Sequence, residues 1–329
     1  MKIIIRSPNW IGDAVLCLSS ITYLKEKMPR AHITVLAKDW VKEIFLNHPS
    51  VDEIISLDRP KISLIKNIKK LNFDVGILFT NSFSSACLFY LSGLKKRIGY
   101  KTDFRNAFLT EKIPLPKNLD KLHQRDYYLE IIKKLVSGNE LPKNPFLYLT
   151  NEEITKTDRM LESLGINKDT IIIGMCPGAS YGSAKMWGVK NFWSLAGKIT
   201  ENKNAKVLIF GSRKEEELGE IIREDIEDAI NLCGKTTTRE LMALIKKCDV
   251  FITNDTGPMH VASALNIPTI AIFGPTNIDR TSPLGPSVII KKDVICSPCK
   301  HRICPSKNHE CMGKISIDEV FETVEKQLK

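Results

Sequence analysis

Short runs of aliphatic and β-branched residues alternate with amphipathic stretches along the chain, and this alternation constrains the fold more than any other feature. In residues 1–150 the runs are Lys2–Arg6, His32–Ala37, Glu53–Leu57, Val75–Thr80 and Arg97–Tyr100. In residues 151–329 they are Ile171–Met175, Lys206–Phe210, Ala229–Leu232, Val250–Thr253, Thr269–Phe273 and Ser287–Ile290. This order predicts an α/β fold with parallel strands covered by helices on both faces.

A length of 329 residues exceeds what one hydrophobic core usually supports, so we predict two domains. The segment Ser137–Pro145 is polar and rich in Gly, Asn and Pro, which indicates a linker and places the domains at residues 1–145 and 146–329. Two such Rossmann-like domains facing a central cleft would bind ligands at the carboxyl ends of their strands. Helices are expected over Asp13–Met28 and Lys121–Val136, and after capping boxes at Thr150…Glu153 and Ser316…Glu319.

The net positive charge of the chain comes entirely from its first half. Residues 1–150 contain 24 Lys or Arg and 14 Asp or Glu, whereas residues 151–329 contain 24 of each. The first half is therefore expected to meet an anionic partner such as a lipid headgroup, a phosphorylated sugar or a nucleic acid. The chain contains no recognised nucleic-acid-binding motif, so we predict no nucleic-acid partner.

The cysteine content and the N-terminus favour a protein of the cytoplasm. Nine cysteines at irregular spacing argue against a secreted disulfide scaffold, and Asp13 interrupts the apolar stretch that a signal peptide would need. The uncharged stretch between Asp74 and Lys95 has the length of a membrane span but contains six Ser, Thr or Asn residues, so it divides better into a strand and a helix.

The loop after the first strand has the sequence R-S-P-N-W-I-G-D, from Arg6 to Asp13. Asp13 has two readings, as the N-cap of the following helix or as a general base that accepts a proton from an attacking hydroxyl. Asn9 and Trp10 stand where a dinucleotide fingerprint needs glycines, and no P-loop motif occurs in the chain. An ordinary nicotinamide-dependent dehydrogenase or P-loop enzyme is therefore disfavoured.

The loops after three strands of the second half suggest a phosphate site. The block N-D-T-G-P-M-H, from Asn254 to His260, starts a helix with Asp255 or Thr256 as its cap, and Gly257 lets a phosphate approach the helix N-terminus. It could equally be an ordinary strand-to-helix connection. The small-residue loop Pro177–Trp187 contains Ser180 and one cation, Lys185, which is either a pyrophosphate partner or a solvent-exposed lysine.

A third strand is followed by F-G-S-R-K-E, in which Glu215 could accept a hydrogen bond from a ribose hydroxyl.

These blocks resemble the bacterial lipopolysaccharide heptosyltransferases, inverting glycosyltransferases of the GT-B fold. The matching residues are R-S-P-N-W-I-G-D, P-G-A-S with K-M-W, F-G-S with Glu215, N-D-T-G-P-M-H-V-A-S-A-L and F-G-P-T-N. The opening block is most similar to the heptosyltransferase II branch, since the heptosyltransferase I branch lacks Pro-Asn-Trp.

The resemblance implies a donor, a transfer reaction and a set of site residues. The donor would be ADP-L-glycero-D-manno-heptose, and the acceptor would be the first heptose of the inner core, attached to Kdo and lipid A. The implied base is Asp13 and the implied phosphate-binding lysine is Lys185. Implied donor-binding residues are Ser180, Glu215, Asp255, Thr256, Gly257 and His260. Our candidates for acceptor contacts are Lys95, Lys96 and Arg97, because of the positive charge of the first half, together with Asn9.

The expected reaction uses no cofactor or metal, and the enzyme would work in the cytoplasm at the inner face of the inner membrane. For Lys95, Lys96 and Arg97, simple solubility is an alternative to acceptor binding. For the function of the whole chain, one alternative is another heptosyltransferase of the same family with a different core sugar as acceptor. Another alternative for the function is a non-catalytic nucleotide-sugar sensor, which would have no need for Asp13.

Four cysteines near the C-terminus, Cys296, Cys299, Cys304 and Cys311, have one zinc-like Cys-x-x-Cys pair, but their remaining spacing matches no standard finger. Free or reversibly paired thiols are therefore expected in preference to a metal site. The other five, Cys17, Cys87, Cys176, Cys233 and Cys248, are expected to be small buried hydrophobes.

Overall fold

The computed structural model describes residues 1–138 and 140–328, which form two compact units, Met1–Tyr148 (unit 1) and Leu149–Lys329 (unit 2). The predicted boundary at residues 145 and 146 lies slightly earlier in the chain. Asn139, which belongs to the predicted linker, and Lys329, the end of the predicted closing helix, lie outside the described residues.

Unit 1 is built on a parallel sheet of six strands in the order β3-β2-β1-β4-β5-β6. The strands are β1 (Lys2–Arg6), β2 (His32–Ala37), β3 (Glu53–Ser56), β4 (Val75–Leu78), β5 (Lys96–Tyr100) and β6 (Glu111–Ile113). Ile3, Ile4 and Ile5 are completely buried, as expected for a central strand covered on both faces.

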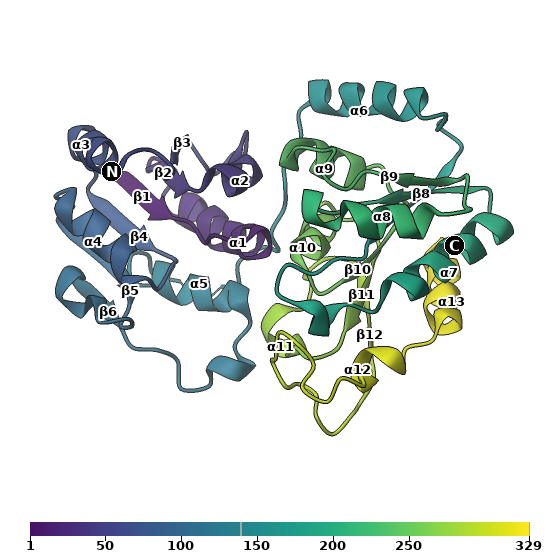
Figure 1. Cartoon of the computed structure of the whole chain (residues 1–329). Helices are drawn as coiled ribbons and strands as arrows, with labels where there is room; N and C mark the ends of the chain where they lie inside the picture. Colours follow the sequence, from purple (N-terminus) through teal and green to yellow (C-terminus); the bar gives the residue numbers. More distant parts are fainter. Residues whose placement is uncertain (139, 329) are drawn as a thin grey trace. The chain divides into compact units, whose positions relative to one another are not determined.

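The helices of unit 1 form two layers, one on each face of this sheet (Figure 1). One layer contains α3 (Lys61–Leu71) and α4 (Phe83–Leu91), whose Leu64, Ile68, Ala86 and Phe89 pack on Ile4 and Leu78 of the sheet. The other contains α1 (Ile11–Lys27) and α5 (Gln124–Ile132), which pack against each other. Shorter helices are α2 (Asp39–Lys42), η1 (Glu43–Phe45), η2 (Arg105–Phe108) and η3 (Leu119–Lys121).

Unit 2 repeats the plan with a parallel sheet in the order β12-β11-β10-β7-β8-β9. The strands are β7 (Ile171–Cys176), β8 (Ala205–Ile209), β9 (Ala229–Asn231), β10 (Val250–Asn254), β11 (Thr269–Phe273) and β12 (Ser287–Lys291). β10 and β7 are neighbours at the centre of the sheet, so the loops that follow them begin side by side at its carboxyl edge.

In unit 2, α7 (Val189–Asn202), α8 (Glu216–Arg223) and α13 (Ile317–Gln327) share one hydrophobic core with the sheet. α6 (Asn151–Ser163), α9 (Thr238–Ile245) and α10 (Gly257–Ala264) pack in sequence beside one another. The short helices are η4 (Ser183–Lys185), η5 (Arg213–Glu215), α11 (Ile278–Thr281) and α12 (Glu310–Gly313). Among the described residues no helix is long and apolar enough to span a bilayer.

The sequence analysis did not predict β6, and it placed the start of α1 two residues too late. This helix begins at Ile11 with Trp10 at the N-cap position, so the reading of Asp13 as the N-cap is wrong. The capping box at Thr150 and Glu153 is present, whereas the one at Ser316 is only half formed. Ser316 accepts the backbone N–H of Glu319, but the Glu319 carboxylate pairs with Lys292 at 2.7 Å instead of returning to the cap.

The capping box of α6 is also an ion-pair site that joins α6 to α9, because Glu153 Oε2 lies 2.6 Å from Arg239 Nη2. The Arg239 guanidinium lowers the pKa of Glu153 to about 2. The stabilisation that this ion pair gives the folded state is therefore fully present above the ordinary pKa of glutamate, and it is lost as the pH falls toward 2. We predict that Glu153→Gln lowers the free energy of unfolding by about 2 kcal/mol at neutral pH.

Thermal unfolding of the intact chain between pH 7 and pH 3 measures this effect, with Glu152→Gln as the control because Glu152 is an exposed neighbour. The difference between wild type and Glu153→Gln should shrink as the pH falls. A difference independent of pH would contradict the ion-pair account.

Candidate functional site

The carboxyl edge of the unit 2 sheet is held together by a buried ion pair. Lys185 Nζ, from the loop after β7, lies 2.6 Å from Asp255 Oδ2, directly after β10, and the two side chains are 12% and 5% exposed. Thr276, after β11, donates to the same carboxylate oxygen at 2.7 Å. Three adjacent strand ends therefore meet at one carboxylate, and the reading of Lys185 as a solvent-exposed lysine is wrong.

Asn254, the last residue of β10, fixes both ends of the loop that contains Lys185. Its Nδ2 donates to the carbonyl of Pro177 at 2.6 Å, and its Oδ1 accepts the backbone N–H of Trp187 at 3.1 Å. Sequence analysis gave Asn254 no role. A buried amide at the end of an apolar strand was nevertheless a usable signal, because such a group needs partners.

Glu215 lies against the same loop. Its Oε2 accepts the backbone N–H of Ser212 at 2.6 Å and the Ser212 hydroxyl at 2.8 Å, which closes a capping box over η5. A Cβ added at Gly178 would lie 1.7 Å from Glu215 Oε1, so the lack of a side chain at Gly178 lets the Glu215 carboxylate approach the loop this closely. The structure thus brings Glu215 next to the Pro177–Trp187 loop, in which Ser180 is exposed.

The N-terminus of α10 adjoins the ion pair. Thr256 occupies the N-cap position, but within the described residues its hydroxyl caps no backbone N–H, which corrects the expectation that Thr256 or Asp255 caps the helix. Pro258 is the second residue of the helix and not its first. His260 is buried in its first turn. Backbone N–H groups and the positive end of the helix dipole are therefore available beside Gly257 for an anion.

In unit 1, Asp13 lies in the first turn of α1, at the carboxyl edge of the sheet. Tyr128 of α5 donates its hydroxyl to Asp13 Oδ1 at 3.1 Å. Burial raises the pKa of Tyr128 well above its ordinary value, and the Asp13 carboxylate raises it further. Tyr128 thus remains a protonated donor that orients Asp13. Sequence analysis did not identify it, since nothing in the sequence pairs residues 115 positions apart.

Asn9 is held by two neighbours in front of β1. Its Oδ1 accepts a hydrogen bond from Arg6 at 2.5 Å, and its carbonyl accepts from Trp40 Nε1 at 3.0 Å. Arg6 is almost completely buried, and this burial lowers its pKa to about 10. The exposed Asn9 side chain is therefore fixed in place by a cation beneath it.

The structure does not bring Lys95, Lys96 and Arg97 to Asp13. They stand at or just before the start of β5, at the amino edge of the sheet, whereas Asp13 follows the carboxyl end of β1. Arg97 is also committed elsewhere, because its Nε donates to the carbonyl of Phe108 at 2.5 Å and its guanidinium lies 5.4 Å from the Tyr90 ring. A direct role for these three cations beside the Asp13 carboxylate has no geometric support.

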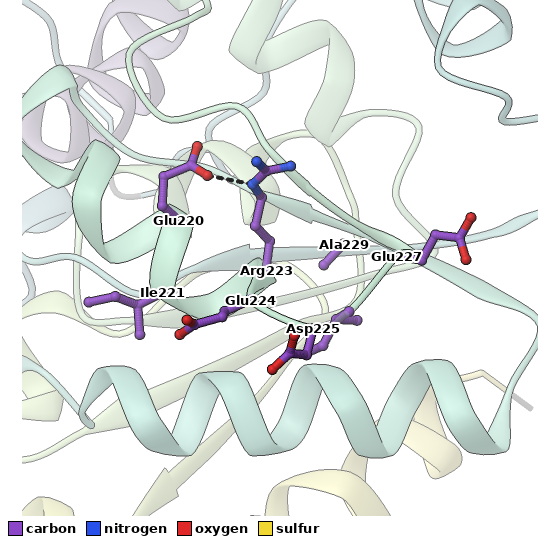
Figure 2. Close-up of a pocket in the computed structure, with 8 residues that line it drawn as sticks. Glu220, Ile221, Arg223, Glu224, Asp225, Glu227 and Ala229 are labelled. Atoms are coloured by element: carbon purple, nitrogen blue, oxygen red, sulfur yellow. Dashed lines mark hydrogen bonds and ion pairs between the residues drawn. The ribbon is translucent and has the colours of Figure 1, made fainter.

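A cavity of about 800 Å³ lies at the opposite end of unit 2 from these loops. Figure 2 shows Glu220 and Arg223 of α8 paired at its rim, with Glu224, Asp225 and Glu227 around it. Because the α8–β9 connection lies at the amino edge of the sheet, this cavity contains none of the predicted site residues. We do not assign the donor to it.

The cysteine-rich segment covers the outside of the loops at the carboxyl edge. Tyr181 donates its hydroxyl to the carbonyl of Lys300 at 2.8 Å, and the Lys300 N–H donates to Pro275 at 2.8 Å. All nine cysteines are free thiols, and Cys87 is only half-buried, contrary to its prediction. Over residues 1–138 and 140–328, no three His, Cys, Asp or Glu side chains are arranged to hold a metal ion.

Residues 61–310 match the family model for glycosyltransferase family 9 (heptosyltransferase). Among curated proteins, the chain is 31% identical to lipooligosaccharide heptosyltransferase 2 of Campylobacter jejuni, with 99% of each chain covered. It is 29% identical to lipopolysaccharide heptosyltransferase 2 of Escherichia coli over 87% of this chain and 86% of that one.

Solved structures agree with this similarity. The structure of E. coli ADP-heptose lipopolysaccharide heptosyltransferase II superimposes with a TM-score of 0.87 at 26% identity, covering 100% of this chain and 98% of that one. A family 9 glycosyltransferase from Veillonella parvula has the same TM-score at 22% identity, with 99% and 97% covered. The expected fold class, GT-B with two Rossmann-like α/β units, is confirmed.

The buried pair at the carboxyl edge leads to a prediction about folding. Replacing one partner of a buried ion pair leaves the other charge unpaired, so Lys185→Met should lower the free energy of unfolding by roughly 3–5 kcal/mol. The double variant Lys185→Met/Asp255→Asn should recover a large part of that loss.

Chemical denaturation of the four proteins in this double-mutant cycle measures the coupling. Additive losses from the two substitutions would show that the pair does not stabilise the strand ends.

Proposed function

The chain belongs to glycosyltransferase family 9, the heptosyltransferases, and on this premise we propose that it transfers heptose from ADP-L-glycero-D-manno-heptose to the first heptose of the lipopolysaccharide inner core. The observation that carries the proposal is similarity over 99% and 87% of the chain to proteins named lipooligosaccharide and lipopolysaccharide heptosyltransferase 2. The opening block R-S-P-N-W-I-G-D supports the same assignment.

The carboxyl edge of unit 2 would bind the ADP part of the donor. The N–H groups at the start of α10 and the Lys185 ammonium would face the pyrophosphate, where negative charge increases as ADP leaves. Asp255 neutralises part of the Lys185 charge. The main effect of Asp255 on donor binding would therefore be to hold the Lys185 ammonium in place. Glu215, fixed by Ser212 beside Gly178, would accept a hydrogen bond from the ribose, with Ser180 in the same loop.

Asp13 would act as the general base. Its carboxylate takes the proton from the acceptor hydroxyl while the hydroxyl oxygen bonds to the anomeric carbon of the donor. The bond from that carbon to the β-phosphate oxygen breaks on the opposite face, and its electron pair leaves with ADP, so the configuration inverts. Tyr128 orients the carboxylate, and Asn9 would contact the acceptor.

The acceptor implies the place of action. Kdo carboxylates and lipid A phosphates are anionic, which agrees with the excess of 24 basic over 14 acidic residues in residues 1–150. The enzyme would work in the cytoplasm as a peripheral protein on the inner membrane, without a nucleic-acid partner.

The assignment is tested by ADP release from ADP-heptose with Kdo–lipid A or heptosyl-Kdo–lipid A as acceptor. The proposal predicts turnover only with the heptosylated acceptor. Turnover only with the unheptosylated acceptor would assign the chain to another step of the same family, and ADP binding without turnover on either acceptor would contradict the proposal.

The assignment of Asp13 gives a separate prediction. Asp13→Asn should lower kcat by about 10²–10⁴-fold, because a general base contributes that much, while ADP affinity and folding stay unchanged. Tyr128→Phe should retain most of the activity, since it keeps the carboxylate and loses only its orientation. Steady-state rates beside ADP binding by calorimetry measure both, and near-full activity of a folded Asp13→Asn protein would show that Asp13 is not the base.

A further inference from the structure

The two helical layers of unit 1 differ in charge. α3 and α4, on one face of the sheet, contain four lysines and no Asp or Glu. α1 and α5, on the other face, contain acidic and basic residues together, among them Glu26 and Lys27 or Glu130 and Arg125. The α3–α4 layer therefore contributes four of the ten excess positive charges of the chain, whereas the α1–α5 layer contributes none.

The lysines of α3 face solvent without partners. Leu64 and Ile68 pack inward, and Lys61, Lys66, Lys69 and Lys70 are exposed on the remaining surface. Across residues 1–138 and 140–328, none of the four has a carboxylate partner, whereas Lys25 and Lys38 elsewhere in unit 1 pair with Asp52 and Asp58. Their field is thus available to an anionic partner.

Large apolar side chains stand on the same layer. Ile62 of α3 is 72% exposed, and Phe83, Tyr90 and Leu91 of α4 are each about half exposed. Phe83 and Tyr90 contact the Phe108 ring of η2, with centroids 5.1 and 5.3 Å away, which makes a continuous aromatic strip.

Phe104, at the start of η2, is 96% exposed and has a φ of +54°. A bulky residue in the left-handed region costs free energy, and none of the described residues of unit 1 buries the ring. Asp103 beside it has a φ of +48°, so the two residues form one left-handed turn that presents the Phe104 ring to solvent, where a second apolar environment could receive it.

We propose that the α3–α4 layer, defined as Lys61–Leu71 and Phe83–Leu91 with Phe104 and η2, is the surface that docks on an anionic lipid bilayer. Lysines without acidic neighbours bind anionic headgroups, and exposed aromatic and aliphatic side chains enter the interfacial region beneath them. A surface for nucleic acid would need the lysines but would gain little from Ile62 and Phe104. The lipid surface therefore fits both observations.

This inference deepens the proposed function, since it rests on an acceptor carried by lipid and names the face of unit 1 that meets the membrane. Lys95 and Lys96 stand just before and at the start of β5, a few residues after the end of α4. Their place at the amino edge of the sheet is unsuited to Asp13, but it suits phosphates at the bilayer surface.

The test is co-sedimentation of the full chain with vesicles of phosphatidylethanolamine and phosphatidylglycerol, or of phosphatidylcholine alone. Each lysine near an anionic surface contributes about fivefold in partitioning, so Lys66→Gln/Lys69→Gln should weaken binding roughly 25-fold. The matched control is Lys133→Gln/Lys134→Gln, two exposed lysines just after α5 with the same change in net charge. Phe104→Ser should weaken binding about tenfold without loss of stability, since the ring is exposed.

Binding to anionic vesicles that both α3–α4 layer variants reduce, and the control leaves unchanged, supports the inference. If the control pair weakened binding as much as the α3 pair, the binding would depend on net charge alone. If the lysine variant weakened binding but Phe104→Ser did not, the partner would be purely anionic. Either result overturns the inference. Turnover of a delipidated heptosyl-Kdo oligosaccharide tests the catalytic function separately. If the wild-type protein turned over this oligosaccharide but did not bind vesicles, only the docking surface would be overturned. If it bound vesicles but did not turn over the oligosaccharide, only the proposed function would be overturned.

Discussion

The arrangement of unit 2 depends on one carboxylate. Asp255 accepts hydrogen bonds from Lys185 and Thr276, so the loops after β7, β10 and β11 meet in a fixed geometry. Parallel strands bring these loops to one edge, but the strands alone do not determine where the loops point. The ion pair does so, Asn254 bonds to both ends of the loop after β7, and Glu215 lies close to Gly178 in the same loop.

Unit 1 has its own parallel sheet of the same kind, and the carboxyl edge of that sheet holds the proposed base in place of the donor loops. The carboxyl end of β1 delivers Asp13 in the first turn of α1, where Tyr128 of the packed helix α5 reaches it. The other helical layer contributes no group to this site, and its composition is free to serve a different surface. The separation of Asp13 from the lysines of α3 thus follows from helices on opposite faces of one sheet.

Strand positions could be read from the sequence because period and burial give a strong local signal. Lys2–Arg6, His32–Ala37 and Thr269–Phe273 have the predicted bounds. β6 was missed, since Glu111–Ile113 is short and mostly exposed at the sheet edge. The candidate site was found as separate motifs, each at the end of a strand, because loops of small and polar residues stand out between apolar runs.

What the sequence could not provide were the pairings between those motifs. The Lys185–Asp255 contact joins residues 70 positions apart, and nothing local distinguishes a buried lysine from an exposed one. Arg97 was expected at the acceptor because of its charge, yet its position at the start of β5 and its bond to Phe108 depend on the tertiary fold. Charge composition predicted an anionic partner, while the layer that we propose faces it could be named only with the helices in place.

Hydrogen–deuterium exchange with and without ADP tests the central claim most directly. If the carboxyl edge of unit 2 binds the nucleotide, ADP should slow exchange in residues 177–187, 254–260 and 274–277. Protection confined to residues 220–229 around the cavity at the amino edge, or no protection at saturating ADP, would contradict the account.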